Sequence, residues 1–193
     1  MSKVNLLFLS VFMSLFCLHG QNYVQLNDSV ECGASNHISI YGTYEDVKVL
    51  EGFLKNCSDL EYIRIKGFSS GEHWNHLFSL LSQHSSLKGL ELFYNDGLEK
   101  VPKKIKENNS LRTISIIGNK DLNYEDLFKK LMKHDNLQKV SLVDNKLKEV
   151  PGALKNLKGL KKLHISGNDA LNYEHLIDNL KESNIEELSI PLN

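Results

Sequence analysis

The string from Glu72 to His76 contains the residue types most typical of a catalytic or metal-binding site. His73 and His76 are three residues apart, so a helix would place both imidazoles on one side, with the Glu72 carboxylate nearby as a base. The HExxH spacing of zinc hydrolases is absent, as are a Gly-rich phosphate loop and a Gly-x-Ser-x-Gly sequence. We therefore expect no catalytic residue, no metal ligand and no cofactor. A metal-dependent enzyme that uses His73 and His76 remains an alternative.

Repeat alignment gives the same string a structural explanation. Trp74 aligns with the aromatic residues Tyr44, Tyr124 and Tyr173, which recur once in each longer repeat, and His73 aligns with the helix N-cap positions. Residues that a structural position explains do not require a catalytic role.

Composition excludes several classes of protein. The chain has 193 residues, 41% of them hydrophobic, and a formal net charge of −1. A domain that binds nucleic acid through bulk charge is usually strongly basic, so we expect no nucleic-acid partner. Three cysteines are too few for a four-thiolate zinc site or a dense disulfide scaffold.

Residues 1–20 have the pattern of a secretory signal peptide. Lys3 precedes an uncharged, mostly apolar stretch over residues 4–18, which is short for a membrane span. Cleavage after Gly20 would leave a mature chain without an integral membrane span, exported to the periplasm, the cell surface or the medium. Lipidation of Cys17 remains an alternative, although the bulky Phe16 is unfavourable before an acylated cysteine.

Residues 35–193 contain a repeat of 23 to 27 residues. Its copies start at Leu60, Leu87, Leu111, Leu137, Leu160 and Ile185, with a degenerate earlier copy at Ser35. The third and fifth residues after each start are aliphatic, the alternation of a short strand with one buried face. The eighth residue is asparagine at Asn95, Asn119, Asn145, Asn168 and Asn193, and Phe68 breaks the series.

The segments LKGLELFYN, LRTISIIGN, LQKVSLVDN and LKKLHISGN resemble the leucine-rich repeat family. This resemblance implies an α/β right-handed solenoid of about six coils. Its parallel sheet lies on the concave side, helices and turns lie on the convex side, and the last coil is truncated. Residues 21–34 then form an N-terminal capping segment. Long coils predict helices after Asn123 and Asn172, whereas the two coils that contain Val-Pro are shorter.

Two sets of residues have expected structural roles. An inward asparagine at the end of each strand satisfies backbone groups of its own and the neighbouring coil, so we expect a ladder of asparagines. Cys32 and Cys57 each precede a repeat start by three residues. They occupy equivalent positions in consecutive coils, close enough for a disulfide in an oxidising compartment.

The concave face is the candidate binding surface, because residues between the core aliphatics point out of the sheet. An apolar stripe of Phe93, Ile117 and Val143 is flanked there by lysines. The alternative is that these residues merely suit an exposed strand, and that the many lysines of residues 100–162 only solvate the convex side. The predicted contacts are Tyr62, Arg64, Lys66, Glu91, Phe93, Ile117, Lys139, Val143, Lys162 and His164.

Leucine-rich repeat proteins are generally recognition scaffolds, so the resemblance implies non-catalytic binding of a protein or glycan. A structural, self-assembling protein is the second possibility. Either Glu186 and Glu187 protect the last strand, or that edge pairs with another chain. Glycosylation at the sequons of Asn27, Asn56 and Asn108 depends on the host.

Overall fold

The structure, a computed structural model, describes residues 24–25, 36–41, 51–68, 73–181 and 183–190. The predicted signal peptide, Cys17, Cys32, Asn27 and Asn193 lie outside these residues, as does most of the predicted capping segment.

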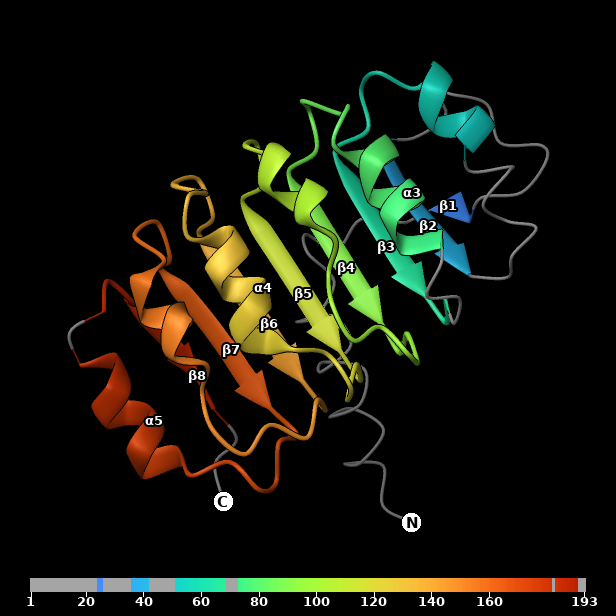
Figure 1. Cartoon of the computed structure of the whole chain (residues 1–193). Coiled ribbons are helices and arrows are strands. Elements are labelled where there is room, and N and C mark those ends of the chain that lie inside the picture. The colour runs from blue at the N-terminus through green and yellow to red at the C-terminus, as the bar shows by residue number, and fades with distance from the viewer. Residues whose placement is uncertain (1–23, 26–35, 42–50, 69–72, 182, 191–193) are drawn as a thin grey trace, which may run out of the picture.

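One open parallel sheet of eight strands forms the frame of the molecule (Figure 1). The strands follow one another across the sheet in chain order, and every neighbouring pair is parallel. They are β1 (Val24–Gln25), β2 (His37–Tyr41), β3 (Tyr62–Lys66), β4 (Gly89–Phe93), β5 (Thr113–Ile117), β6 (Lys139–Val143), β7 (Lys162–Ser166) and β8 (Glu187–Ser189). The predicted α/β class with a parallel sheet is confirmed.

The register places equivalent repeat positions on neighbouring strands. Ile65 pairs with Leu92, which pairs with Ile116, which pairs with Leu142 and then Ile165. The register holds because β2 to β7 each have five residues and bury alternate residues on the same side, so a one-residue slip would expose the aliphatic set.

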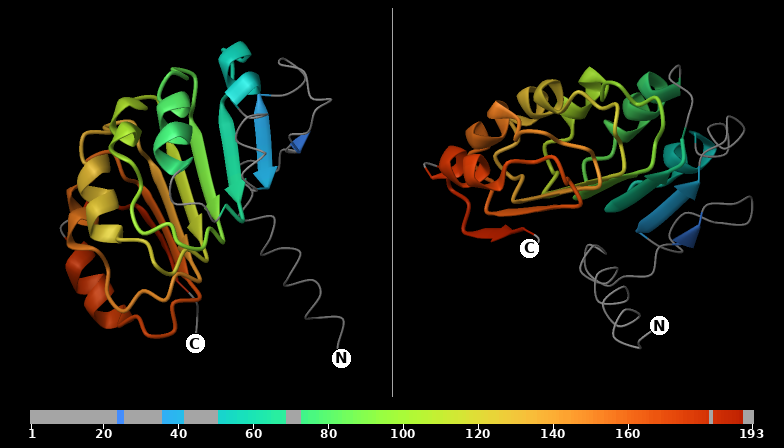
Figure 2. Two further views of the ribbon diagram at one scale, coloured as in Figure 1. Left: turned by 45° about the vertical axis from the view of Figure 1, so that its right-hand side comes forward. Right: turned by 90° about the horizontal axis from the view of Figure 1, so that it is seen from below.

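Helical segments connect the strands and lie together over one face of the sheet (Figure 2). The long connections contain α-helices, which are α3 (His73–Leu81), α4 (Tyr124–Leu131) and α5 (Tyr173–Leu180), and residues 51–56 are also helical. The two shorter connections contain 3₁₀ helices, η1 (Lys103–Glu107) and η2 (Gly152–Asn156). Seen from below, the helices follow the outer side of an arch and the strands follow its inner side (Figure 2).

Local sequence explains where the α-helices begin. The Asn123 side chain accepts a hydrogen bond from the backbone of Asp126, and Asn172 accepts one from His175. These are the two predicted N-caps. Pro102 and Pro151 precede the 3₁₀ helices, since proline has the φ of a first helical position and has no N–H that would need a partner.

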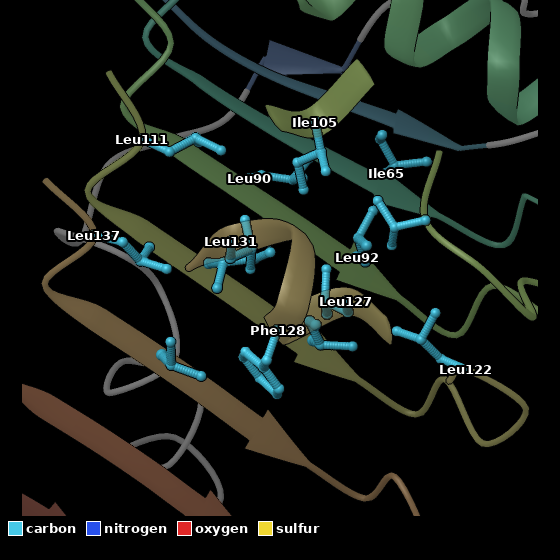
Figure 3. Packing of buried hydrophobic residues seen from close by; sticks show 14 of the residues in the cluster. Ile65, Leu90, Leu92, Ile105, Leu111, Leu122, Leu127, Phe128, Leu131 and Leu137 are labelled. Carbon is cyan, nitrogen blue, oxygen red and sulfur yellow. The ribbon is translucent and has the colours of Figure 1, made fainter. Parts of the chain in front are cut away.

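The hydrophobic core lies between the sheet and the helices (Figure 3). Leu127, Phe128 and Leu131 of α4 are fully buried, together with the strand residues Leu90 and Leu92. The first residue of each of five repeats is also buried at the start of its strand, namely Leu60, Leu87, Leu111, Leu137 and Leu160. The repeats therefore share one continuous core.

Buried asparagines tie consecutive repeats together where the strands end. The Asn119 amide donates to the carbonyl of Leu92 on the preceding strand, and its oxygen accepts from the backbone N–H of Asn95. The same two bonds to the preceding repeat are made by Asn145 and Asn168. Phe68 stands where an asparagine is expected, and its own backbone N–H donates to the Asn95 oxygen. Phe68 thus ends the series, with its ring packed edge-on against Trp74.

The turns after β3 to β7 each use a left-handed residue. Gly118 has φ of +68° there, whereas Tyr94 and Asp144 adopt φ of +48° and +54° at equivalent positions without being glycine. A Cβ on Gly118 would lie 2.2 Å from the Tyr94 ring, so this glycine provides the space in which Tyr94 packs.

Candidate functional site

The candidate site is the sheet face that points away from the helices, here called the strand face. Register places its residues in three rows that run across the strands. The first row is Tyr62, Gly89, Thr113, Lys139, Lys162 and Glu187. The second is Ser39, Arg64, Glu91, Ser115, Ser141, His164 and Ser189. The third is Tyr41, Lys66, Phe93, Ile117, Val143 and Ser166.

Arg64 organises the part of the strand face nearer the N-terminus. Its Nε lies 2.6 Å from a carboxylate oxygen of Glu91, which is completely buried. The same guanidinium lies over the ring of Phe93, 4.8 Å from its centroid. A buried carboxylate requires a close cation, and Arg64 provides it while covering part of an aromatic ring.

Lys66 and Tyr41 extend this cluster of cations and rings. The Lys66 ammonium lies 5.3 Å from the centroid of the Tyr41 ring, and Tyr41 is 45% exposed. Tyr41 was not among the predicted contacts. The degenerate first repeat provides the signal that would have identified it, because Tyr41 occupies the same row as Phe93.

The expected exposed apolar stripe is wrong for two of its three members. Ile117 and Val143 are each only 5% exposed, whereas Phe93 is half-buried. Side chains on the inner side of an arched sheet converge, so residues that alternate away from the core still lose much of their exposure. Ile117 and Val143 therefore do not form the exposed patch that the sequence predicts.

Tyr62 and Glu91 are likewise buried. The Tyr62 ring stacks on His37 with centroids 4.5 Å apart, and it occupies the space that a Cβ on Gly89 would need. Burial raises the pKa of Tyr62. The predicted contacts that remain accessible are Arg64, Lys66, Phe93, Lys139, Lys162 and His164.

Three serines of the second row carry buried hydroxyls that lack partners. Within the residues that the structure describes, the hydroxyls of Ser39, Ser115 and Ser141 make no hydrogen bond. An unpaired buried hydroxyl lowers stability, and buried polar groups without a partner are uncommon in native proteins. These three hydroxyls lie beneath the accessible surface of the strand face.

The part of the strand face nearer the C-terminus is cationic. Lys162 lies 2.5 Å from the Glu187 carboxylate, which raises the pKa of Lys162 and lowers that of Glu187. Lys139 forms no ion pair among the described residues. Burial, helped by the positive charge of Lys139, lowers the pKa of His164, and Nε2 of this histidine lies 3.1 Å from the Ser166 hydroxyl.

The residues considered for metal binding are placed on the other face, at the start of α3. His76 Nε2 lies 3.2 Å from a carboxylate oxygen of Glu51, and Glu72 lies outside the described residues. No group of three His, Cys, Asp or Glu side chains in the described part of the chain is arranged to hold a metal ion. None of its helices is long and apolar enough to cross a bilayer.

Two remaining predictions concern covalent modification. Cys57 is buried, while Cys32 lies outside the described residues, so their disulfide stays a prediction. Asn108 is 4% exposed and its amide donates to the carbonyl of Leu81, so this sequon is poorly placed for glycosylation of the folded chain. Asn56 is exposed.

No family model and no curated protein matches this chain.

Proposed function

We propose that this chain is a non-catalytic binding protein of the leucine-rich-repeat type, which recognises a protein or glycan through its strand face. The motif series from Ser35 onward supports the family, and the strand order, in which each repeat pairs with the next, is compatible with a solenoid. The predicted signal peptide supports a site of action outside the cytoplasm.

One observation carries the proposal. The register gathers on one face an accessible group of rings and cations, namely Tyr41, Lys66, Arg64 and Phe93, beside the unpartnered serine hydroxyls. Aromatic residues and arginine dominate the binding energy of protein interfaces, and aromatic rings with polar neighbours suit both protein and sugar surfaces. The helical segments that the structure describes lie on the opposite face of the sheet (Figure 2).

The test replaces accessible residues of the strand face, and leaves the buried Ile117 and Val143 intact. The exported protein is immobilised, and bound components of the native extracellular extract are identified by mass spectrometry, with a glycan array in parallel. We expect Tyr41→Ala with Lys66→Ala to reduce capture of a specific ligand at least about tenfold, because an interface residue of this type contributes about 1–2 kcal/mol or more.

The matched control is Met132→Ala with Lys133→Ala, which removes an exposed apolar residue and a lysine at the end of α4, on the helical side. Capture that is lost in the control and retained in the strand-face variant would contradict the proposal.

A further inference from the structure

Two grooves on the helical side occupy equivalent places in the repeat. The first has a volume of about 820 Å³ and lies between the start of α3 and the connection that contains η1. The second has a volume of about 580 Å³ and lies between the start of α4 and the connection that contains η2. We call them the α3 groove and the α4 groove. Each is lined by the aromatic residue of its helix, Trp74 or Tyr124, together with the Val-Pro pair of the following connection.

A carboxylate of the chain itself occupies the α4 groove. Glu125, the second residue of α4, lines this groove, and its carboxylate accepts a hydrogen bond of 3.1 Å from the backbone N–H of Ala153. This bond lowers the pKa of Glu125, so the side chain is held in the groove as an anion. A groove of this kind therefore accommodates a glutamate side chain.

The α3 groove lacks a residue that corresponds to Glu125. The exposed Asn75 occupies the equivalent position, as the second residue after the N-cap position of α3. Among the described residues that line this groove, Glu99 provides the one carboxylate, and it is exposed, whereas four lysines contribute positive charge. The α3 groove therefore carries an excess of positive charge and is without the carboxylate that its counterpart contains.

The four lysines of the α3 groove differ in how far the chain itself engages them. Lys130 of α4 is 8% exposed, and its ammonium has two acceptors within the chain. Lys104 is paired with Glu107. Lys100 and Lys103 are exposed and form no ion pair among the residues that the structure describes. Their charges are therefore available to an external anion.

Trp74 gives the α3 groove a wall with an unmet hydrogen bond. The Tyr124 hydroxyl donates to the carbonyl of Asn119, whereas the Trp74 N–H is buried and makes no hydrogen bond within the described part of the chain. Buried polar groups without a partner are uncommon in native proteins. Because this N–H is buried, a ligand in the groove contacts it only if the ring turns. Trp74 is the single tryptophan of the chain, so its fluorescence reports such a change directly.

We propose that the α3 groove binds a glutamate or aspartate side chain from an acidic peptide segment of a partner protein. This side chain takes the place that Glu125 takes in the α4 groove, its carboxylate pairs with Lys100 and Lys103, and its methylene groups pack against the Trp74 ring. The occupant of the α4 groove is itself a peptide side chain, which favours a peptide over a sugar or a free ion. The α3 groove lies on the helical side, so this inference does not depend on the strand face.

The first test titrates the protein with a hexaglutamate peptide and measures binding by calorimetry and by the emission of Trp74. We expect saturable binding that changes the emission, and no binding of hexaglutamine. Lys100→Gln with Lys103→Gln should weaken binding at least about tenfold, because it removes both unpaired charges. Lys155→Gln with Lys158→Gln is the matched control. It removes the same charge from exposed lysines of another groove, so only a screened, long-range effect of less than about threefold should remain.

The second test supplies the missing carboxylate from the chain itself. Asn75→Glu places a glutamate at the position that Glu125 has in α4, so it should compete with the peptide and weaken hexaglutamate binding about tenfold. Asn156→Glu adds the same charge at an exposed position of η2, outside the α3 groove, and should leave the affinity nearly unchanged. Asn75→Gln, which adds no charge, should bind hexaglutamate as the wild type does.

Four results would overturn the inference. They are an absence of saturable hexaglutamate binding, binding that leaves the emission of Trp74 unchanged, equal weakening by a groove variant and its matched control, and tighter binding of an oligogalacturonate, which carries carboxylates on a sugar chain. Circular dichroism of each variant distinguishes lost binding from lost folding.

Discussion

Asn119 illustrates how a single residue links three repeats through its side chain and its backbone N–H. Its amide donates to the carbonyls of Leu92 and Ile117, and its oxygen accepts from both the backbone and the side chain of Asn95. Its own backbone N–H donates to the oxygen of Asn145. An ionised aspartate has no donor and alanine has neither group, so asparagine is the small residue whose side chain both donates to these carbonyls and accepts from these N–H groups.

Asn119→Ala should lower the free energy of unfolding by about 1–3 kcal/mol for each buried group that it leaves unpaired. Two carbonyls and two N–H groups, the backbone and side-chain N–H of Asn95, lose a bond, although some will find water. Denaturant titration measures the loss. Asn136→Ala is the control, because Asn136 makes its one hydrogen bond on the surface and should cost far less. Equal losses in the two variants would show that the buried asparagines contribute no special stability.

The sequence predicted the hydrogen bonds of the asparagines better than it predicted how exposed the side chains of the strand face are. The position of Asn119 followed from repeat spacing, since its partners are backbone groups that recur with the repeat. The burial of Ile117 and Val143 did not follow from alternation, which assigns a face of the sheet but not how strongly that face curves. Alternation also does not predict that the hydroxyls of Ser115 and Ser141 are buried without a hydrogen-bond partner.

At the scale of elements, the length of each connection determines its helix type. The connections that contain α3, α4 and α5 have room for two turns of α-helix, whereas the two Val-Pro connections form a single 3₁₀ segment each. The Asn caps of α4 and α5 and the Pro residues before η1 and η2 are the sequence features that distinguish the α-helical from the 3₁₀ connections. We expect connections of unequal length to make the curvature of the sheet uneven.

Two equivalent histidines follow α3 and α4 in the chain. His84 and His134 each lie three residues after the last leucine of the helix, and they are 6% and 3% exposed. His134 Nε2 lies 3.0 Å from the carbonyl oxygen of Ile105 in η1. Burial lowers the pKa of both histidines below the ordinary 6.5, so both are held neutral in the folded chain.

This burial predicts a loss of stability in mild acid. Below pH 6.5 the unfolded chain binds protons at these sites that the folded chain resists, so stability falls as the pH drops from 6.5 through the lower folded-state pKa values. His134→Gln should flatten the dependence of the melting temperature on pH below 6.5. Parallel curves for wild type and His134→Gln would contradict this explanation.

The whole molecule was predictable in outline because each strand pairs only with the strands of adjacent repeats. A chain-order parallel sheet requires no knowledge of distant contacts, so the repeat spacing that relates Ile116 to Leu142 already specifies the pairing. The end of the sheet was not predictable to the same degree. Ile177 has the same helix position as Phe128, and only the neighbouring repeat decides whether such a residue is buried.

The disulfide predicted between Cys32 and Cys57 would stabilise the whole molecule by covalently linking its first two repeats. Cys57 is 1% exposed, so Cys57→Ala is combined with Cys32→Ser to avoid burying a hydroxyl. If the bridge forms, the double variant should lose about 3 kcal/mol of unfolding free energy. Intact mass after alkylation, with and without reduction, shows whether the protein carries it. Two freely alkylated thiols in the native protein would exclude the bridge.

The strict order of the strands also bears on how the chain acquires its structure. Residues that pair across the sheet, such as Ile116 and Leu142, are about one repeat apart in the chain, so no pairing waits for remote segments to meet. Any two adjacent repeats form a nucleus, and growth then proceeds outward in either direction, one loop closure at a time. We expect folding to start in the central repeats, because each of them has a neighbouring repeat on both sides with which to pair.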